Sequence, residues 1–277
     1  MRFPVRLPAL ALAATLMVVN ALGAAAADRD RLQAFLSVTG FDVALESIKL
    51  SAGDAPRMLG LEAADFGESW SRLTDEVFDV DVMKGMALDI LGRTLSDEAL
   101  SHGAEFYATD LGQRLVEAEN SSHMADRSDK RQTGAEVLAE IMDSDPERVK
   151  LLERMNDAID SDDNSLRGVQ EIEFRFLTAA RDAGIIRMKV DDEGLRAMQA
   201  EQAEELKADM RLSSLANAAG TYRDFSNAEV EAYAEALEQP LMQEVYELMN
   251  AVQYEIMANR FEVVASRMAE LDPGQEL

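Results

Sequence analysis

An acidic stretch near the middle of the chain contains the residue types most able to bind a metal. It reads DSDDNSLRGVQE over residues 160–171. A calcium loop of the EF-hand type takes oxygen ligands from its first, third, fifth and twelfth positions. Oxygen-bearing side chains occupy these four positions, namely Asp160, Asp162, Asn164 and Glu171. Ser165 stands where the loop needs a glycine for its sharp turn, so the stretch is an incomplete calcium candidate. The alternative is a polar turn that caps the next helix.

The two histidines, His102 and His123, are too far apart in the sequence to share one helical turn. His102 and Glu105 are three residues apart, which makes them neighbours on one helical face. A catalytic zinc site takes three protein ligands, and only two can be named here. The chain has no cysteine, which excludes disulfides, thiol catalysis and lipid attachment at a cysteine. We therefore expect no cofactor and no metal centre.

The sequence lacks the common catalytic motifs. It has no G-x-S-x-G, no Walker loop, no dinucleotide fingerprint and no H-E-x-x-H. This favours a non-enzymatic role, most simply a protein-interaction or adaptor module. The alternative is an enzyme, or a protein that binds a small ligand or metal, with a site of scattered acids and His102.

Apolar residues recur at intervals of three and four rather than two, and β-branched runs are nearly absent. The pattern predicts an all-α protein, a helical bundle. Asp145 before Pro146, and Ser226 three residues before Glu229, are signals of helix starts. The expected helices, some of them bent or split, cover residues 29–51, 62–93, 97–109, 111–142, 146–160, 166–183, 192–222 and 227–270.

Two segments match each other at a shift of 130 residues, Leu95–Glu119 and Phe225–Met249. They share an apolar stripe at helical spacing, which buries one face of each. This predicts two related helical halves, residues 28–161 and 162–277, which pack against each other or against a second copy of the chain. A chance likeness between two amphipathic helices is the alternative.

Both segments are interrupted in the middle. The first breaks at ATDLG, residues 108–112, and the second at EQPLM, residues 238–242, where Pro240 removes one backbone hydrogen bond. Each segment is thus expected to form a helix, a sharp bend and a second helix.

The first segment carries a Phe106-Tyr107 pair before the bend and Gly112-Gln113 after it. This arrangement resembles a family of exported bacterial proteins catalogued as domain of unknown function 2059. The family has Ser-Pro where this chain has Thr109 and Asp110, and the second segment lacks the aromatic pair and the glycine. The resemblance implies a helical fold and export, and it supplies no catalytic residue.

The repeated bend is our candidate interaction surface, with a structural corner as the alternative. It would present a protein partner with residues from both segments, namely Phe106, Tyr107, Asp110, Gly112, Gln113, Pro240 and Gln243.

The first residues combine Arg2 and Arg6, an apolar run and small residues up to Ala27. This is the pattern of a secretory signal peptide, with cleavage expected between Ala27 and Asp28. The apolar run is shorter than the ~20 residues of a spanning helix, so no membrane insertion is expected after cleavage. The sequence therefore predicts a periplasmic or secreted protein.

The chain is strongly acidic, with a formal net charge of −26. Cleavage would remove two arginines and no acid, which brings the charge to −28. Such a field repels nucleic-acid phosphates and anionic lipids. We expect no nucleic-acid partner, and a periplasmic protein or a second copy of the chain as the partner.

Overall fold

The computed structural model describes residues 28–53, 55–160 and 163–271, and the predicted signal segment lies outside them. The regular elements of the described residues are all helical, which confirms the predicted all-α fold. Residues 28–39 are helical and precede the first labelled helix. The α-helices that follow are α2 (Phe41–Ala52), α3 (Gly67–Val77), α4 (Val80–Thr94), α5 (Asp97–Tyr107), α6 (Asp110–Met124), α7 (Arg127–Ser144), α8 (Pro146–Ile159), α9 (Asn164–Asp182), α10 (Asp192–Thr221), α11 (Asn227–Leu237) and α12 (Pro240–Arg267). Short 3-10 turns occupy Ala55–Leu59, Ala63–Phe66 and Met268–Glu270.

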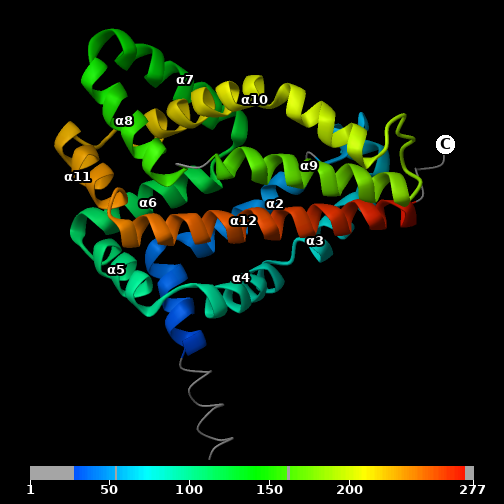
Figure 1. Cartoon of the computed structure of the whole chain (residues 1–277), viewed down its shortest axis with the longest axis horizontal. Coiled ribbons are helices and arrows are strands. Elements are labelled where there is room, and N and C mark those ends of the chain that lie inside the picture. The colour runs from blue at the N-terminus through cyan, green and yellow to red at the C-terminus, as the bar shows by residue number, and fades with distance from the viewer. Residues whose placement is uncertain (1–27, 54, 161–162, 272–277) are drawn as a thin grey trace, which may run out of the picture.

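Helix α12 is the axis of the bundle. Its 28 residues span about 42 Å at 1.5 Å per residue. It contacts α9, α5, α4, α3, α2 and α8, and Figure 1 shows it crossing the molecule with α9 alongside. Many of its buried residues recur at spacings of three and four, which places them along one side of the helix. They include Met242, Val245, Met249, Val252 and Ile256.

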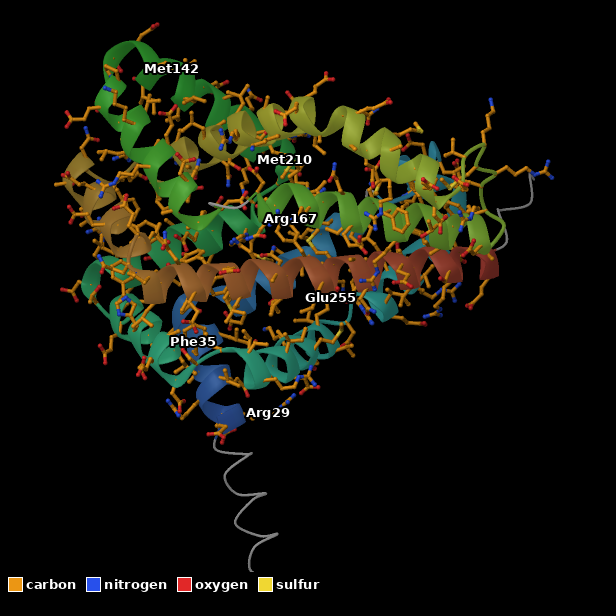
Figure 2. All side chains as sticks on the ribbon, in the orientation of Figure 1. Arg29, Phe35, Met142, Arg167, Met210 and Glu255 are labelled. Carbon is orange, nitrogen blue, oxygen red and sulfur yellow. The ribbon has the colours of Figure 1, made fainter. Side chains whose placement is uncertain are left out.

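One hydrophobic core runs through the molecule. A single cluster of buried residues extends from Leu32 to Met268 and takes members from both predicted halves. Side chains fill the space between α12 and its neighbours, while Met142 lies at the outer side of α7 (Figure 2). The two ranges 28–161 and 162–277 therefore share their core.

Three expected helices are split where a local signal favours a break. Gly40 separates residues 28–39 from α2 with φ at 75°, a conformation that glycine adopts without strain. Asp79 accepts a hydrogen bond from Val82 N and starts α4. Asp126 accepts hydrogen bonds from the N–H groups of Ser128 and Asp129 and starts α7. Carboxylate caps of this kind satisfy amides that the helix itself leaves free.

The two predicted bends are present, at the α5–α6 and α11–α12 junctions. Helix α5 ends at Tyr107 and α6 begins at Asp110, while α11 ends at Leu237 and α12 begins at Pro240. These ends and starts coincide at the shift of 130 residues. A common origin of the two segments stays a prediction.

The first corner depends on Thr109 and Gly112. Thr109 Oγ1 accepts a hydrogen bond of 3.0 Å from Gly112 N, and Gln113 Nε2 donates one of 3.1 Å to Ala108 O. A Cβ on Gly112 would lie 2.6 Å from Tyr107 Cα, closer than real Cβ atoms approach. The tight turn therefore needs a residue without a side chain.

None of the helices in the described part of the chain has the length and apolar character needed to cross a bilayer.

Replacing Gly112 with alanine should destabilise the protein by about 1–3 kcal/mol, because the new methyl group pushes against the end of α5. Gly85→Ala is the matched control, since the nearest atom to its Cβ would be 3.9 Å away. That change should stabilise the fold by about 0.5–1 kcal/mol through higher helix propensity. Urea unfolding measures both, and an equal effect of the two changes would contradict the account of the corner.

Candidate functional site: a polar cavity beside a tyrosine cluster

Four of the five tyrosines meet where the two corners face each other. Tyr107 ends α5, Tyr233 lies on α11, Tyr246 lies on α12 and Tyr222 follows α10. The hydroxyls of Tyr107 and Tyr233 are 2.8 Å apart, and those of Tyr233 and Tyr246 are 2.7 Å apart. Tyr107 also forms a hydrogen bond with Tyr246. The three hydroxyls thus form a closed triangle inside the protein.

The carboxylate of Glu119, on α6, accepts hydrogen bonds from this cluster. Tyr222 Oη donates to Glu119 Oε1 over 2.7 Å, and Tyr233 Oη donates to the same oxygen over 2.8 Å. Because Tyr233 gives its proton to Glu119, only the two protons of Tyr107 and Tyr246 remain for the three edges of the triangle, so Tyr233 accepts at least one of them. The hydrogen bonds that end on Glu119 Oε1 therefore connect α6 directly to Tyr222 and to α11, and through Tyr233 to α5 and α12.

Burial sets the proton affinities in this cluster. Loss of hydration raises the pKa of Glu119, and the hydrogen bonds from Tyr222 and Tyr233 partly oppose that rise. Burial, followed by the nearby charge of Glu119, raises the pKa of Tyr233 well above its ordinary value. The phenols are thus held as neutral hydrogen-bond donors.

Arg148 holds the segment that carries Tyr222. This side chain is only 6% exposed, and its guanidinium donates to Tyr222 O and, over 3.2 Å, to Asn227 Oδ1. Asn227 Nδ2 in turn donates to Asp145 Oδ2 over 3.0 Å. The start of α8 therefore fixes both the end of α10 and the start of α11.

A cavity of about 220 Å³ lies beside the cluster. Residues of α2, α6, α7, α8, α10, α11 and α12 form its wall, and Tyr222, Tyr233 and Tyr246 line one part of it. Ser214 and Asn217 of α10 line the cavity and are also exposed, so they stand at its opening.

Four polar groups that line this cavity lack a partner among the described residues. Both phenol hydrogen bonds to Glu119 end on Oε1, which leaves Oε2 free. Asn120 Oδ1 is completely buried and accepts no hydrogen bond. The His123 ring and Lys130 Nζ form neither a hydrogen bond nor an ion pair with any described residue. Asn120 Oδ1 is the fully buried one of the four, and such an atom is normally satisfied in a folded protein; the other three groups remain accessible from the cavity.

His123 is half-buried on α6, one helical turn after Glu119. Burial, and then the charge of Lys130, lower the pKa of His123 to about 4. Burial also lowers the pKa of Lys130, with a further contribution from Arg127. Near neutral pH, His123 is therefore an uncharged imidazole that can both donate and accept.

The residues of the predicted interaction surface divide between the interior and the exterior. Tyr107 and Gly112 are buried, and Phe106 is half-buried with its ring stacked on that of Tyr233 at a centroid distance of 5.8 Å. The other four are exposed, namely Asp110, Gln113, Pro240 and Gln243.

Two other predicted features lie apart from the cavity. His102 is half-buried on α5 and is not among the residues that line the cavity. In the calcium candidate, Asp160 Oδ1 accepts from Ser165 N over 3.0 Å, and Glu171 forms an ion pair of 2.6 Å with Arg196.

Asn164 Oδ1 accepts from Arg167, while Asp162 lies outside the described residues. Within residues 28–53, 55–160 and 163–271, no three side chains of the types His, Cys, Asp and Glu are grouped as metal ligands would be.

The cavity residues escaped the sequence analysis because no motif marks them. Glu119 and His123 are four residues apart on α6, a spacing that places both on one helical face. On an acidic chain such a pair reads as part of a solvated surface. One signal in the sequence could have indicated Glu119 and His123: both lie on the helix that follows the bend at residues 108–112.

The fold and the cavity define a class: an all-helical protein in which two helix–bend–helix units face each other beside a polar cavity. Residues 81–140 match the model of a family described as an uncharacterized protein conserved in bacteria (DUF2059), which confirms the resemblance seen in the sequence. The matched segment contains Glu119, Asn120, His123 and Lys130. No curated protein and no solved structure matches the chain.

His123 should make the protein less stable as the pH falls from about 6.5 to 4. In this window the unfolded chain binds a proton at His123 and the folded chain does not, so stability decreases with decreasing pH. His123→Gln should remove this loss and retain about 2 kcal/mol more of the stability between pH 7 and pH 5. Urea unfolding at the two pH values measures the difference.

His102→Gln is the matched control, because it changes the other histidine of the chain. Glu119 acts in the opposite direction, since a raised carboxyl pKa lets the folded state take up a proton first as the pH falls. The contribution of Glu119 to the pH dependence of stability is the same in the wild type and in both histidine variants. An equal pH dependence in all three proteins would refute the burial of a neutral His123.

Tyr233→Phe should cost about 1–3 kcal/mol, because it removes a donor to Glu119 and a hydrogen-bond partner of the Tyr107 and Tyr246 hydroxyls. Tyr254→Phe, which changes the tyrosine outside the cluster, should cost less than about 1 kcal/mol. Chemical denaturation compares the two. Similar losses would show that the triangle of hydroxyls contributes no more than a single ordinary tyrosine.

Proposed function

We propose that this chain is an exported bacterial protein that binds a small polar ligand in the cavity beside Glu119. The observation that carries the proposal is that Glu119 Oε2, the His123 ring and Lys130 Nζ belong to residues that line one cavity, and that all three lack a partner among the described residues.

These groups lose part of their hydration when the chain folds around the cavity. A buried polar group without a hydrogen bond costs about 1–3 kcal/mol, and a charged one costs more. A ligand that supplies the missing partners recovers this free energy. The cavity, at about 220 Å³, is below the roughly 300–1,000 Å³ of sites for drug-sized molecules, which favours a small ligand.

Export rests on the N-terminal pattern of residues 1–27 and on the family resemblance. The proposal places the mature chain in the periplasm or outside the cell, beginning at Asp28. Its charge of −28 keeps such a protein soluble and attracts cationic groups.

An interaction module remains the second candidate, and the exposure of Asp110, Gln113, Pro240 and Gln243 favours it. These residues lie at the outer side of the two corners, where a protein partner or a second copy could reach them. In this case the buried Tyr107 and Gly112 would not contact the partner, and they would hold the exposed residues of the corner in position.

The test uses protein secreted into the periplasm of a Gram-negative host and the low-molecular-mass filtrate of the native periplasm. We expect an intact mass that corresponds to a chain beginning at Asp28, and a rise in Tm when filtrate is added. A ligand at about 100 times its Kd adds about 2.7 kcal/mol, which shifts Tm by about 5–10 °C for a chain of this size.

Asn217→Trp should abolish the shift, because a large side chain at the opening blocks the cavity. Ser213→Trp is the matched control on the exposed side of the same helix, and it should leave the shift unchanged. If filtrate leaves the wild-type Tm unaltered, or shifts both variants equally, the cavity holds only water and the ligand proposal fails.

A further inference from the structure

We infer that the ligand is a small zwitterion of the amino-acid class, with its ammonium group at Glu119 and its carboxylate at Lys130. This inference rests on the proposed function, because it names the chemistry of the molecule that the cavity would bind.

The cavity is lined by two residues of opposite charge, Glu119 and Lys130. Glu119 lies on α6 and Lys130 on α7, and both line the cavity. They form no ion pair with each other or with another described residue. The structure therefore offers one anionic and one cationic group, each without a counter-charge.

A ligand with a single charge would satisfy only one of these groups. The other would remain without a counter-charge in a site from which the ligand displaces water, which is unfavourable. A zwitterion satisfies both and brings no net charge into the site. An ammonium at Oε2 would also stabilise the charged form of Glu119 against the effect of its burial.

The rest of the wall fits a molecule that both donates and accepts hydrogen bonds. Asn250 Nδ2 donates to Ile159 O, which leaves its own carbonyl oxygen available to the cavity. The neutral His123 can donate to a carboxylate beside Lys130.

Aromatic rings cover the Glu119 side of the cavity. Tyr246 and Phe41 pack edge to face at a centroid distance of 5.8 Å, and both line the wall. Aromatic rings beside a carboxylate are a favourable environment for an ammonium group that meets a ring face. The opposite polarity at the two sides would orient the ligand.

The experiment is calorimetric titration of the purified mature protein with the twenty standard amino acids. For each amino acid that binds, two further probes follow: the amine without the carboxylate, and the carboxylic acid without the amino group. We expect at least one amino acid to bind, and both of its analogues to bind at least tenfold more weakly.

Two variants test which residue binds the ammonium group of the ligand and which binds its carboxylate. Glu119→Gln keeps an acceptor for the tyrosines, and it should weaken the amino acid at least tenfold while it leaves the affinity of the acid analogue unchanged. Lys130→Met should weaken the amino acid equally and leave the affinity of the amine analogue unchanged. Glu117→Gln and Lys150→Met are the exposed matched controls and should bind as the wild type does.

The inference is overturned if none of the twenty amino acids binds at millimolar concentration, or if an analogue with one charge binds as tightly as the amino acid. Equal behaviour of the four variants would overturn it as well. The filtrate could still raise the Tm of the wild type but not that of Asn217→Trp. In that case the cavity binds a ligand of another class, and the proposed function stands.

Discussion

The structure depends on one buried carboxylate. Glu119 Oε1 accepts hydrogen bonds from Tyr222 and Tyr233, and the hydroxyls of Tyr107 and Tyr246 complete the network. A carboxylate in the interior is costly unless its hydrogen bonds are good, so these donors must meet it within narrow limits. The end of α5, the end of α10 and the registers of α11 and α12 are therefore fixed relative to α6.

The bend motif has a structural explanation at this carboxylate. Thr109 caps α6, and Gly112 lets its first turn approach the end of α5. The corner thus sends α6 back across the bundle, and Glu119 and His123 reach the interior on its inward face. The short bend motif in this way determines which side chains of α6 line the cavity two to three helical turns further along the helix.

Much of the fold could be predicted from the sequence because its signals are local. Spacings of three and four identified the helices, and Pro240 and the capping box of Ser226 marked their boundaries. Breaks such as the one at Gly40 were harder to predict, because a glycine inside a helical pattern does not reveal its φ angle. The cavity could not be predicted, because Lys130 and Glu119 read as solvated charges until α6 and α7 are placed.

The sequence by itself determined the helical class, the two bends and the family resemblance, since each follows from neighbours within about two helical turns. Only the tertiary structure decided that Tyr107 points into a shared core, that His102 lies apart from the cavity and that His123 lines it. The reason is physical: whether a polar side chain is solvated or buried depends on residues far away in the chain, here on the contact of α6 with α10 and α2. Burial then gives Glu119 and His123 proton affinities that their sequence neighbours do not indicate.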